Sequence, residues 1–200
     1  TATPDRFLVS YTDLYTPEPA IRWLAIDAGT GAVSDAPPRV LGVPASSYPT
    51  PRIGAHTNGV QYLVIEQGAP NKYLGLRLVD GQVVAPTAGV DLGAPNSNET
   101  LGLVAGTNQF AFVQRGRLQR IAASTGALLD AAPIAFSKYG YTDYAGAPAV
   151  AFDGANYIVV WFDSNKLQAS RVRASDVFGL QNDDDFNELG CAAVLCTGTM

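Results

Sequence analysis

Hydrophobic residues along this chain fall into short runs separated by polar, Gly-rich or Pro-rich segments. The clearest run spans 156–163 and reads Asn-Tyr-Ile-Val-Val-Trp-Phe-Asp, with six apolar residues between two polar ends. The run is too short for a globular helix and is rich in β-branched and aromatic residues. It therefore predicts a strand that is buried on both faces.

Three earlier runs look like copies of this strand. All four open with an aromatic residue, at Phe7, Tyr62, Phe110 and Tyr157, so the steps between them are 55, 48 and 47 residues. A nearly fixed period of this length is typical of stacked supersecondary units. We therefore expect Tyr62, Phe110 and Tyr157 to occupy equivalent buried positions.

Each unit reads as four short antiparallel strands, and no window has the sustained i, i+3, i+4, i+7 pattern of a helix. The turn before the last strand of a unit is expected to contain a glycine with positive φ, because glycine adopts that conformation without a steric penalty; these glycines are Gly31, Gly81 and Gly126. The expected units span about 6–43, 52–92, 101–137 and 148–180 of a single domain 1–200, with an acidic loop and a closing strand over 181–200.

Strands that are apolar on both faces, in a chain without helices, need sheets packed on both sides. A β-propeller supplies this, whereas a two-layer sandwich would leave one face wet and impose alternation. The predicted fold is an all-β propeller with four antiparallel four-stranded blades, either a complete ring or a fragment of a larger propeller. The first unit lacks its first strand, and the apolar tail 192–197 is expected to pair beside 7–11 and close the ring.

One segment resembles a known repeat. Residues 152–161, Phe-Asp-Gly-Ala-Asn-Tyr-Ile-Val-Val-Trp, followed by Arg-Val-Arg at 171–173, are similar to the blade repeat of secreted bacterial β-propeller proteins. The resemblance extends over about 6–180 and is strongest in the fourth unit. It implies an extracytoplasmic propeller, secreted or at the cell surface, and assigns no functional residue.

Charge narrows the range of partners. The net charge is −5, which disfavours nucleic acid and favours a neutral or basic partner. Arg115, Arg117 and Arg120 are expected to lie on a solvated hairpin. Since no apolar run approaches the ~20 residues of a membrane span, no membrane insertion is expected.

The two cysteines, Cys191 and Cys196, are predicted to form a disulfide, which would indicate an oxidising compartment. Their odd separation would put the side chains on opposite faces of a strand, so a bridge needs a turn between them. Two free thiols are the alternative.

The predicted topology brings the long, varied connections 12–20, 44–52, 93–100 and 137–147 to one face of the propeller. Long loops on a rigid scaffold commonly bind ligands. Tyrosine offers a large contact area with a polar tip, which suits a glycan or a protein surface. The candidate ligand-binding residues are Tyr15, Tyr48, Tyr139, Tyr141 and Tyr144. The alternative is that these rings pack down over the ends of the blades.

Other candidate chemistry is weaker. Asp183 and Asp185 lie in an acidic segment that could hold Ca²⁺, although it lacks the alternating ligands and central Gly of an EF-hand; no other cofactor is expected. The single histidine, His56, cannot build a His-based metal site. Asp13, Glu66 and Asp163 are candidate acid and base residues of a glycoside hydrolase or lyase.

The sequence therefore predicts a non-catalytic extracellular binding or adhesion module that recognises a glycan or a surface protein through its long-loop face. A structural or self-assembling surface subunit is the first alternative. A propeller-type glycoside hydrolase or lyase ranks lower.

Overall fold

The regular structure of the chain is entirely β in the part described by the computed structural model. That part comprises residues 6–13, 20–33, 39–41, 51–68, 71–80, 82–94, 101–114, 116–136, 148–163 and 166–175. The all-β class predicted from the sequence is confirmed there.

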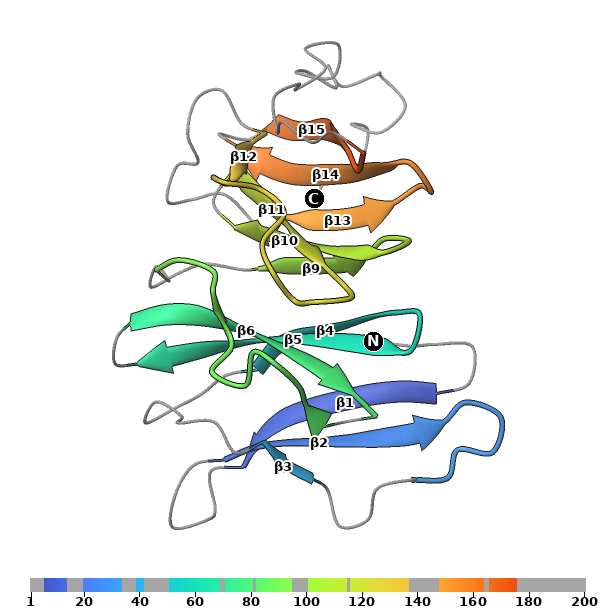
Figure 1. Cartoon of the computed structure of the whole chain (residues 1–200). Helices are drawn as coiled ribbons and strands as arrows, with labels where there is room; N and C mark the ends of the chain where they lie inside the picture. The colour runs from blue at the N-terminus through green and yellow to red at the C-terminus, as the bar shows by residue number, and fades with distance from the viewer. Residues whose placement is uncertain are drawn as a thin grey trace.

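The strands form four antiparallel sheets, which we name A to D in chain order (Figure 1). Sheet A contains β1 (Arg6–Asp13), β2 (Ala20–Asp27) and β3 (Arg39–Leu41). Sheet B contains β4 (Pro51–Thr57), β5 (Val60–Gly68), β6 (Asn71–Val79) and β7 (Gln82–Val83), and β8 (Val90–Asp91) also pairs with β6. Sheet C contains β9 (Gly102–Ala105), β10 (Gln109–Gln114), β11 (Arg117–Ala122) and β12 (Ile134–Ala135). Sheet D contains β13 (Ala149–Phe152), β14 (Asn156–Asp163) and β15 (Lys166–Arg173).

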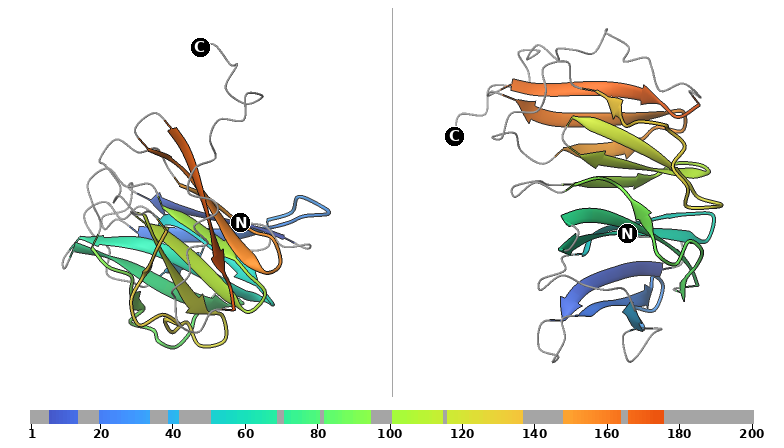
Figure 2. Two further views of the ribbon diagram at one scale, coloured as in Figure 1. Left: turned by 90° about the horizontal axis from the view of Figure 1, so that it is seen from above. Right: turned by 60° about the vertical axis from the view of Figure 1, so that its left-hand side comes forward.

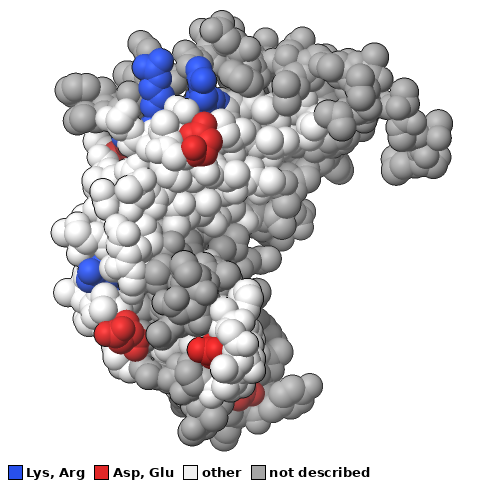
Figure 3. Space-filling model, turned by 90° about the vertical axis from the view of Figure 1, so that its right-hand side faces the viewer, with Lys and Arg blue, Asp and Glu red and all other residues white. Residues whose placement is uncertain are grey.

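The sheets are stacked face to face in chain order, with sheet A at one end of the stack and sheet D at the other (Figures 1 and 2). The first strands β1, β4, β9 and β13 contact one another in succession. On the face that Figure 3 shows, the described Lys, Arg, Asp and Glu side chains lie apart from one another and form no single charged patch.

The described sheets differ from the expected set of four four-stranded units. Sheets A and D have three strands each and sheet B has five. The two end sheets lie apart at opposite ends of the stack (Figure 1). The tail 192–197, which was expected to close a ring, lies outside the described residues.

The second strand of each central sheet is buried on both faces, as the apolar runs predicted. In β10, Phe110 and Phe112 belong to the core between sheets B and C. Ala111 and Val113 belong to the core between sheets C and D. The strand has no polar face because a sheet covers each side of it.

Register shows that one expected equivalence is wrong. The amide of Gly106 donates to Gln109 O and that of Asp153 donates to Asn156 O. Phe110 and Tyr157 follow these two acceptors directly, so they occupy the same position and face the preceding sheet. Tyr62 comes one residue later after its own turn and stacks on Phe110 of the following sheet, with ring centroids 5.2 Å apart. A shift of one residue moves a side chain to the opposite face.

The turns before the last strands of sheets A and C are alike. In both, a glycine with positive φ, Gly31 at 72° and Gly126 at 76°, donates its amide to the carbonyl four residues earlier. The predicted role of glycine is confirmed at these two positions, and Gly81 lies outside the described residues. A different device holds the β13–β14 turn, where the carboxylate of Asp153 accepts hydrogen bonds from the amides of Ala155 and Asn156. These bonds lower the pKa of Asp153.

Val159→Asp is expected to unfold much of the stack. Val159 is fully buried between sheets C and D, so the aspartate would place an unpaired charge in an apolar core. We expect a loss of more than about 4 kcal/mol in the free energy of unfolding, measured by chemical denaturation. Val40→Asp, at a residue that is 54% exposed, is the control and should change stability little.

Gly75→Ala tests a close approach within sheet B. A Cβ atom at Gly75 would lie 2.1 Å from the hydroxyl oxygen of Tyr62, whose ring is fully buried. The ring or the backbone must shift to relieve this overlap, so the variant should lose about 1–3 kcal/mol of stability in the same denaturation assay. Gly29→Ala is the matched control, because its Cβ would meet its nearest neighbour at 3.5 Å. Equal stability of the two variants would contradict the tight packing at Gly75.

Candidate functional site

The ligand, metal and disulfide residues predicted from the sequence all lie outside the described residues. They are Tyr15, Tyr48, Tyr139, Tyr141, Tyr144, Asp183, Asp185, Cys191 and Cys196. Their roles therefore stay predictions.

The candidate catalytic carboxylates belong to three different sheets. Asp13 ends β1, Glu66 lies in β5 and Asp163 ends β14. The carboxylate of Asp13 is paired with Nε of Arg22 at 2.6 Å. Across the described part of the chain, no three His, Cys, Asp or Glu residues gather in a way that could hold a metal ion. The same residues contain no helix long and apolar enough to cross a membrane.

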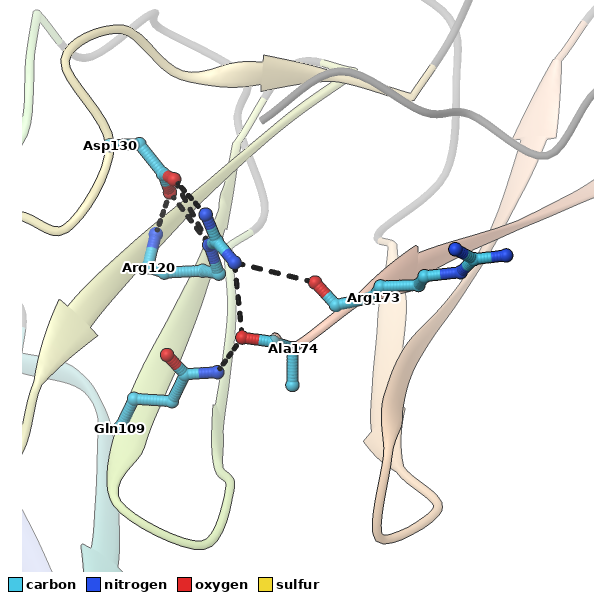
Figure 4. A network of polar contacts seen from close by, with 5 residues as sticks. All are labelled: Gln109, Arg120, Asp130, Arg173 and Ala174. Atoms are coloured by element: carbon cyan, nitrogen blue, oxygen red, sulfur yellow. Dashed lines mark hydrogen bonds and ion pairs between the residues drawn. The ribbon is translucent and has the colours of Figure 1, made fainter. Parts of the chain in front are cut away.

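A buried polar network joins sheets C and D (Figure 4). Arg120 of β11 is buried, and its Nε donates to Oδ1 of Asp130 at 3.0 Å. Its Nη1 donates at 3.0 Å to the carbonyl of Ala174, which directly follows β15. Nε2 of Gln109 donates to the same carbonyl at 2.9 Å. Because these donors are directed at acceptors of the chain itself, the network ties the two sheets together.

The expectation that Arg115, Arg117 and Arg120 share a solvated hairpin is wrong for Arg120. Arg117 is exposed and Arg115 lies outside the described residues. The reason is strand alternation: Arg120 pairs with Ala111, which faces sheet D, so the arginine points into the junction between sheets. The sequence does contain the acidic partner, Asp130. Nothing in its spacing from Arg120 indicated that the two side chains would pair.

The outer face of sheet A is apolar and exposed. Phe7, Val9 and Tyr11 alternate along β1 and are 48%, 39% and 38% exposed. Their partners across β2 are Ile26, Leu24 and Arg22. On β3, Val40 pairs with Arg22 and extends the same surface. We call this surface the end face; it comprises Phe7, Val9, Tyr11, Leu24, Ile26 and Val40.

The residues of the end face on β1 occupy the same strand positions as residues of β10 that are buried between sheets B and C. Phe7 pairs with Ile26 just as Phe110 pairs with Ile121. Ile26 and Ile121 then bridge to Val33 and Leu128 at matching places beyond the turn. Phe7 therefore occupies the position of Phe110, which is fully buried because sheet B covers it.

The other face of sheet A is covered by sheet B. Ile21, Trp23 and Ala25 of β2 are buried against Leu63, Ile65 and Leu76 of sheet B, among other residues. The sequence identified Phe7 as the first copy of the recurrent strand. It did not indicate that this copy would lie at the end of the stack with one face open.

No family model matches this chain, and no curated protein matches it either. A crystal structure of a DUF4623 family protein from Bacteroides eggerthii is similar, with 12% sequence identity and a TM-score of 0.49. The match covers 86% of this chain and 41% of that protein, so the chain spans less than half of its length.

Asp130→Ala should destabilise the junction between sheets C and D. The change leaves the Arg120 guanidinium buried without its carboxylate, which typically costs about 3–5 kcal/mol. Chemical denaturation gives the loss. The control is Asp91→Ala, which breaks the more exposed Lys72–Asp91 pair at 3.6 Å and should cost less than about 1 kcal/mol. Equal losses would mean that the buried pair does not support the stack.

Proposed function

We propose that the four sheets are consecutive blades of a β-propeller arc and that the protein is a non-catalytic interaction module of an extracytoplasmic protein. In this proposal the end face of sheet A binds another β-sheet. The single observation that carries it is the exposure of Phe7, Val9 and Tyr11 in the register of residues that are buried in the other sheets.

Scattered hydrophobic residues on a surface are ordinary, but a continuous apolar surface is not. The end face is continuous, because Val9 pairs with Leu24 and Phe7 with Ile26 across two neighbouring strands. Two charged residues, Arg22 and Asp13, lie on the same side of the sheet, and they are paired with each other. A partner that covered this surface would remove apolar area from water, which is the main driving force of association.

The chemistry of the partner follows from the internal junctions. At each of them, one sheet packs on another through aliphatic and aromatic side chains. A second sheet fits a flat, pleated apolar surface because its own side chains project with the same two-residue spacing.

A second candidate surface is the end of the stack from which the long connections leave. β5, β10 and β14 run in the same direction (Figure 1), and their neighbours β4, β9 and β13 are antiparallel to them. The long connections that lead into β4, β9 and β13 therefore enter the sheets from one side of the stack. This topology supports recognition of a glycan or a surface protein by the loop tyrosines, as expected from the sequence. Those tyrosines lie outside the described residues, so this candidate ranks second.

Site-specific photo-crosslinking tests the role of the end face. A photoreactive benzoylphenylalanine would replace Val9, and a second variant would carry it at Leu129, which lies between β11 and β12 and is 46% exposed. In cells that produce the protein, light should crosslink position 9 to strand segments of this chain or of another protein. Mass spectrometry identifies the crosslinked peptides. Crosslinking from position 9 no greater than from position 129 would refute the proposal.

A further inference from the structure

We infer that Asn58 is a site of spontaneous deamidation, and that its conversion to a carboxylate weakens the junction between sheets B and C. The inference goes beyond the proposed function and concerns a different part of the molecule. It follows from the chemistry of the Asn58-Gly59 turn and from the contacts that the Asn58 side chain makes with the neighbouring sheet.

The turn joins β4 to β5 through two residues, since Thr57 pairs directly with Val60. Both turn residues have positive φ, 48° at Asn58 and 78° at Gly59, as in the tight hairpin turns that favour Asn-Gly. Both are exposed, so water and base reach them. Asn58 is the only asparagine in the sequence that is followed by glycine.

The reaction needs only water. The backbone nitrogen of Gly59, after losing its proton to base, attacks Cγ of Asn58, and ammonia leaves as a five-membered succinimide ring forms. Water then opens the ring at one of its two carbonyls. One opening gives aspartate, and the other gives isoaspartate, in which the main chain runs through Cγ. Gly59 has no Cβ atom to hinder the attack, and its backbone is the most permissive of any residue.

The Asn58 amide is also a contact between sheets. Its Nδ2 donates to the carbonyl of Thr107 at 2.9 Å and to Oδ1 of Asn108 at 3.0 Å, both in the turn between β9 and β10. The hydroxyl of Thr57 reaches the carbonyls of Gly106 and Thr107 at 2.8 Å each. The two turns lie on the same side of the stack (Figure 1) and hold sheets B and C together there.

Deamidation removes the donor from this contact. A carboxylate at position 58 has no proton to donate, so the carbonyl of Thr107 would face a negative charge. The side-chain amide of Asn108 can rotate to present its NH2 group, but a backbone carbonyl cannot. In the isoaspartate product the turn gains one backbone atom, so the two-residue connection loses its geometry. Both products therefore weaken the contact.

Peptide mapping by mass spectrometry tests the reaction. The folded chain is incubated in mildly alkaline buffer, which deprotonates more of the Gly59 amide. Deamidation should be several times faster at Asn58 than at Asn108 or Asn156, which are followed by residues with bulky side chains. Methylation by protein isoaspartate methyltransferase identifies the isoaspartate fraction. Deamidation at Asn58 no faster than at Asn108 would overturn the inference.

Chemical denaturation tests the consequence. The deamidated fraction carries one more negative charge, so anion exchange separates it from the unmodified chain. Its equilibrium constant of unfolding should be about three- to tenfold higher, because hydrogen bonds between the sheets are lost. An unchanged constant would overturn the role of the Asn58 amide in the junction.

Three variants separate the causes. Asn58→Asp reproduces one product and should raise the unfolding constant in the same direction. Asn58→Gly retains positive φ without the reactive amide, so incubation should not lower its stability further. Gln82→Glu creates a carboxylate at another exposed amide of sheet B and should change stability little. An equal loss of stability on incubation in Asn58→Gly and in the wild type would place the damage elsewhere and overturn the inference.

Discussion

The stack depends on one constraint: a sheet that is apolar on both faces must be covered on both faces. Sheets B and C meet it because each lies between two neighbours, as the opposite directions of Phe112 and Val113 show. Stacking satisfies one face of every added sheet and exposes another. A linear stack of such sheets therefore always ends in open apolar faces, unless its last sheets are polar on the outside or meet a partner.

Apolar packing alone does not fix how neighbouring sheets are aligned. Directional hydrogen bonds at the strand ends fix this alignment. The hydroxyl of Thr57 donates to the carbonyl of Gly106 at 2.8 Å, and Nε of Arg77 donates to the carbonyl of Ala123 at 2.8 Å, both between sheets B and C. Arg120 performs the same task between sheets C and D. Each of these donors binds a backbone carbonyl of the neighbouring sheet. The contacts therefore fix the position of that sheet's backbone and do not depend on its side chains.

The strands could be predicted from the sequence because short apolar runs between turn residues have few other solutions. The face of the sheet to which each side chain points could not be predicted, because a run that is apolar throughout has no alternation of polar and apolar residues. Tyr62 shows this: it lies three residues after Gly59, whereas Phe110 and Tyr157 each lie two residues beyond their turns. The prediction that Arg120 is solvated was wrong for a different reason. Its partner, Asp130, becomes its neighbour only when the sheet forms. The loop tyrosines and the cysteines stay predictions.

The composition of the end face supports the proposal that another sheet covers it. Terminal units of stacked proteins that face water carry a polar outer surface, which keeps the stack soluble. Sheet A instead has phenylalanine, valine and tyrosine at successive outward positions of β1, and Phe112 of β10 stands where Val9 stands. Position 11 even has an aromatic residue where sheet C has the polar Gln114. A surface with this apolar register, on which the charged Arg22 and Asp13 are paired with each other, is suited to being covered in the same way, by another sheet.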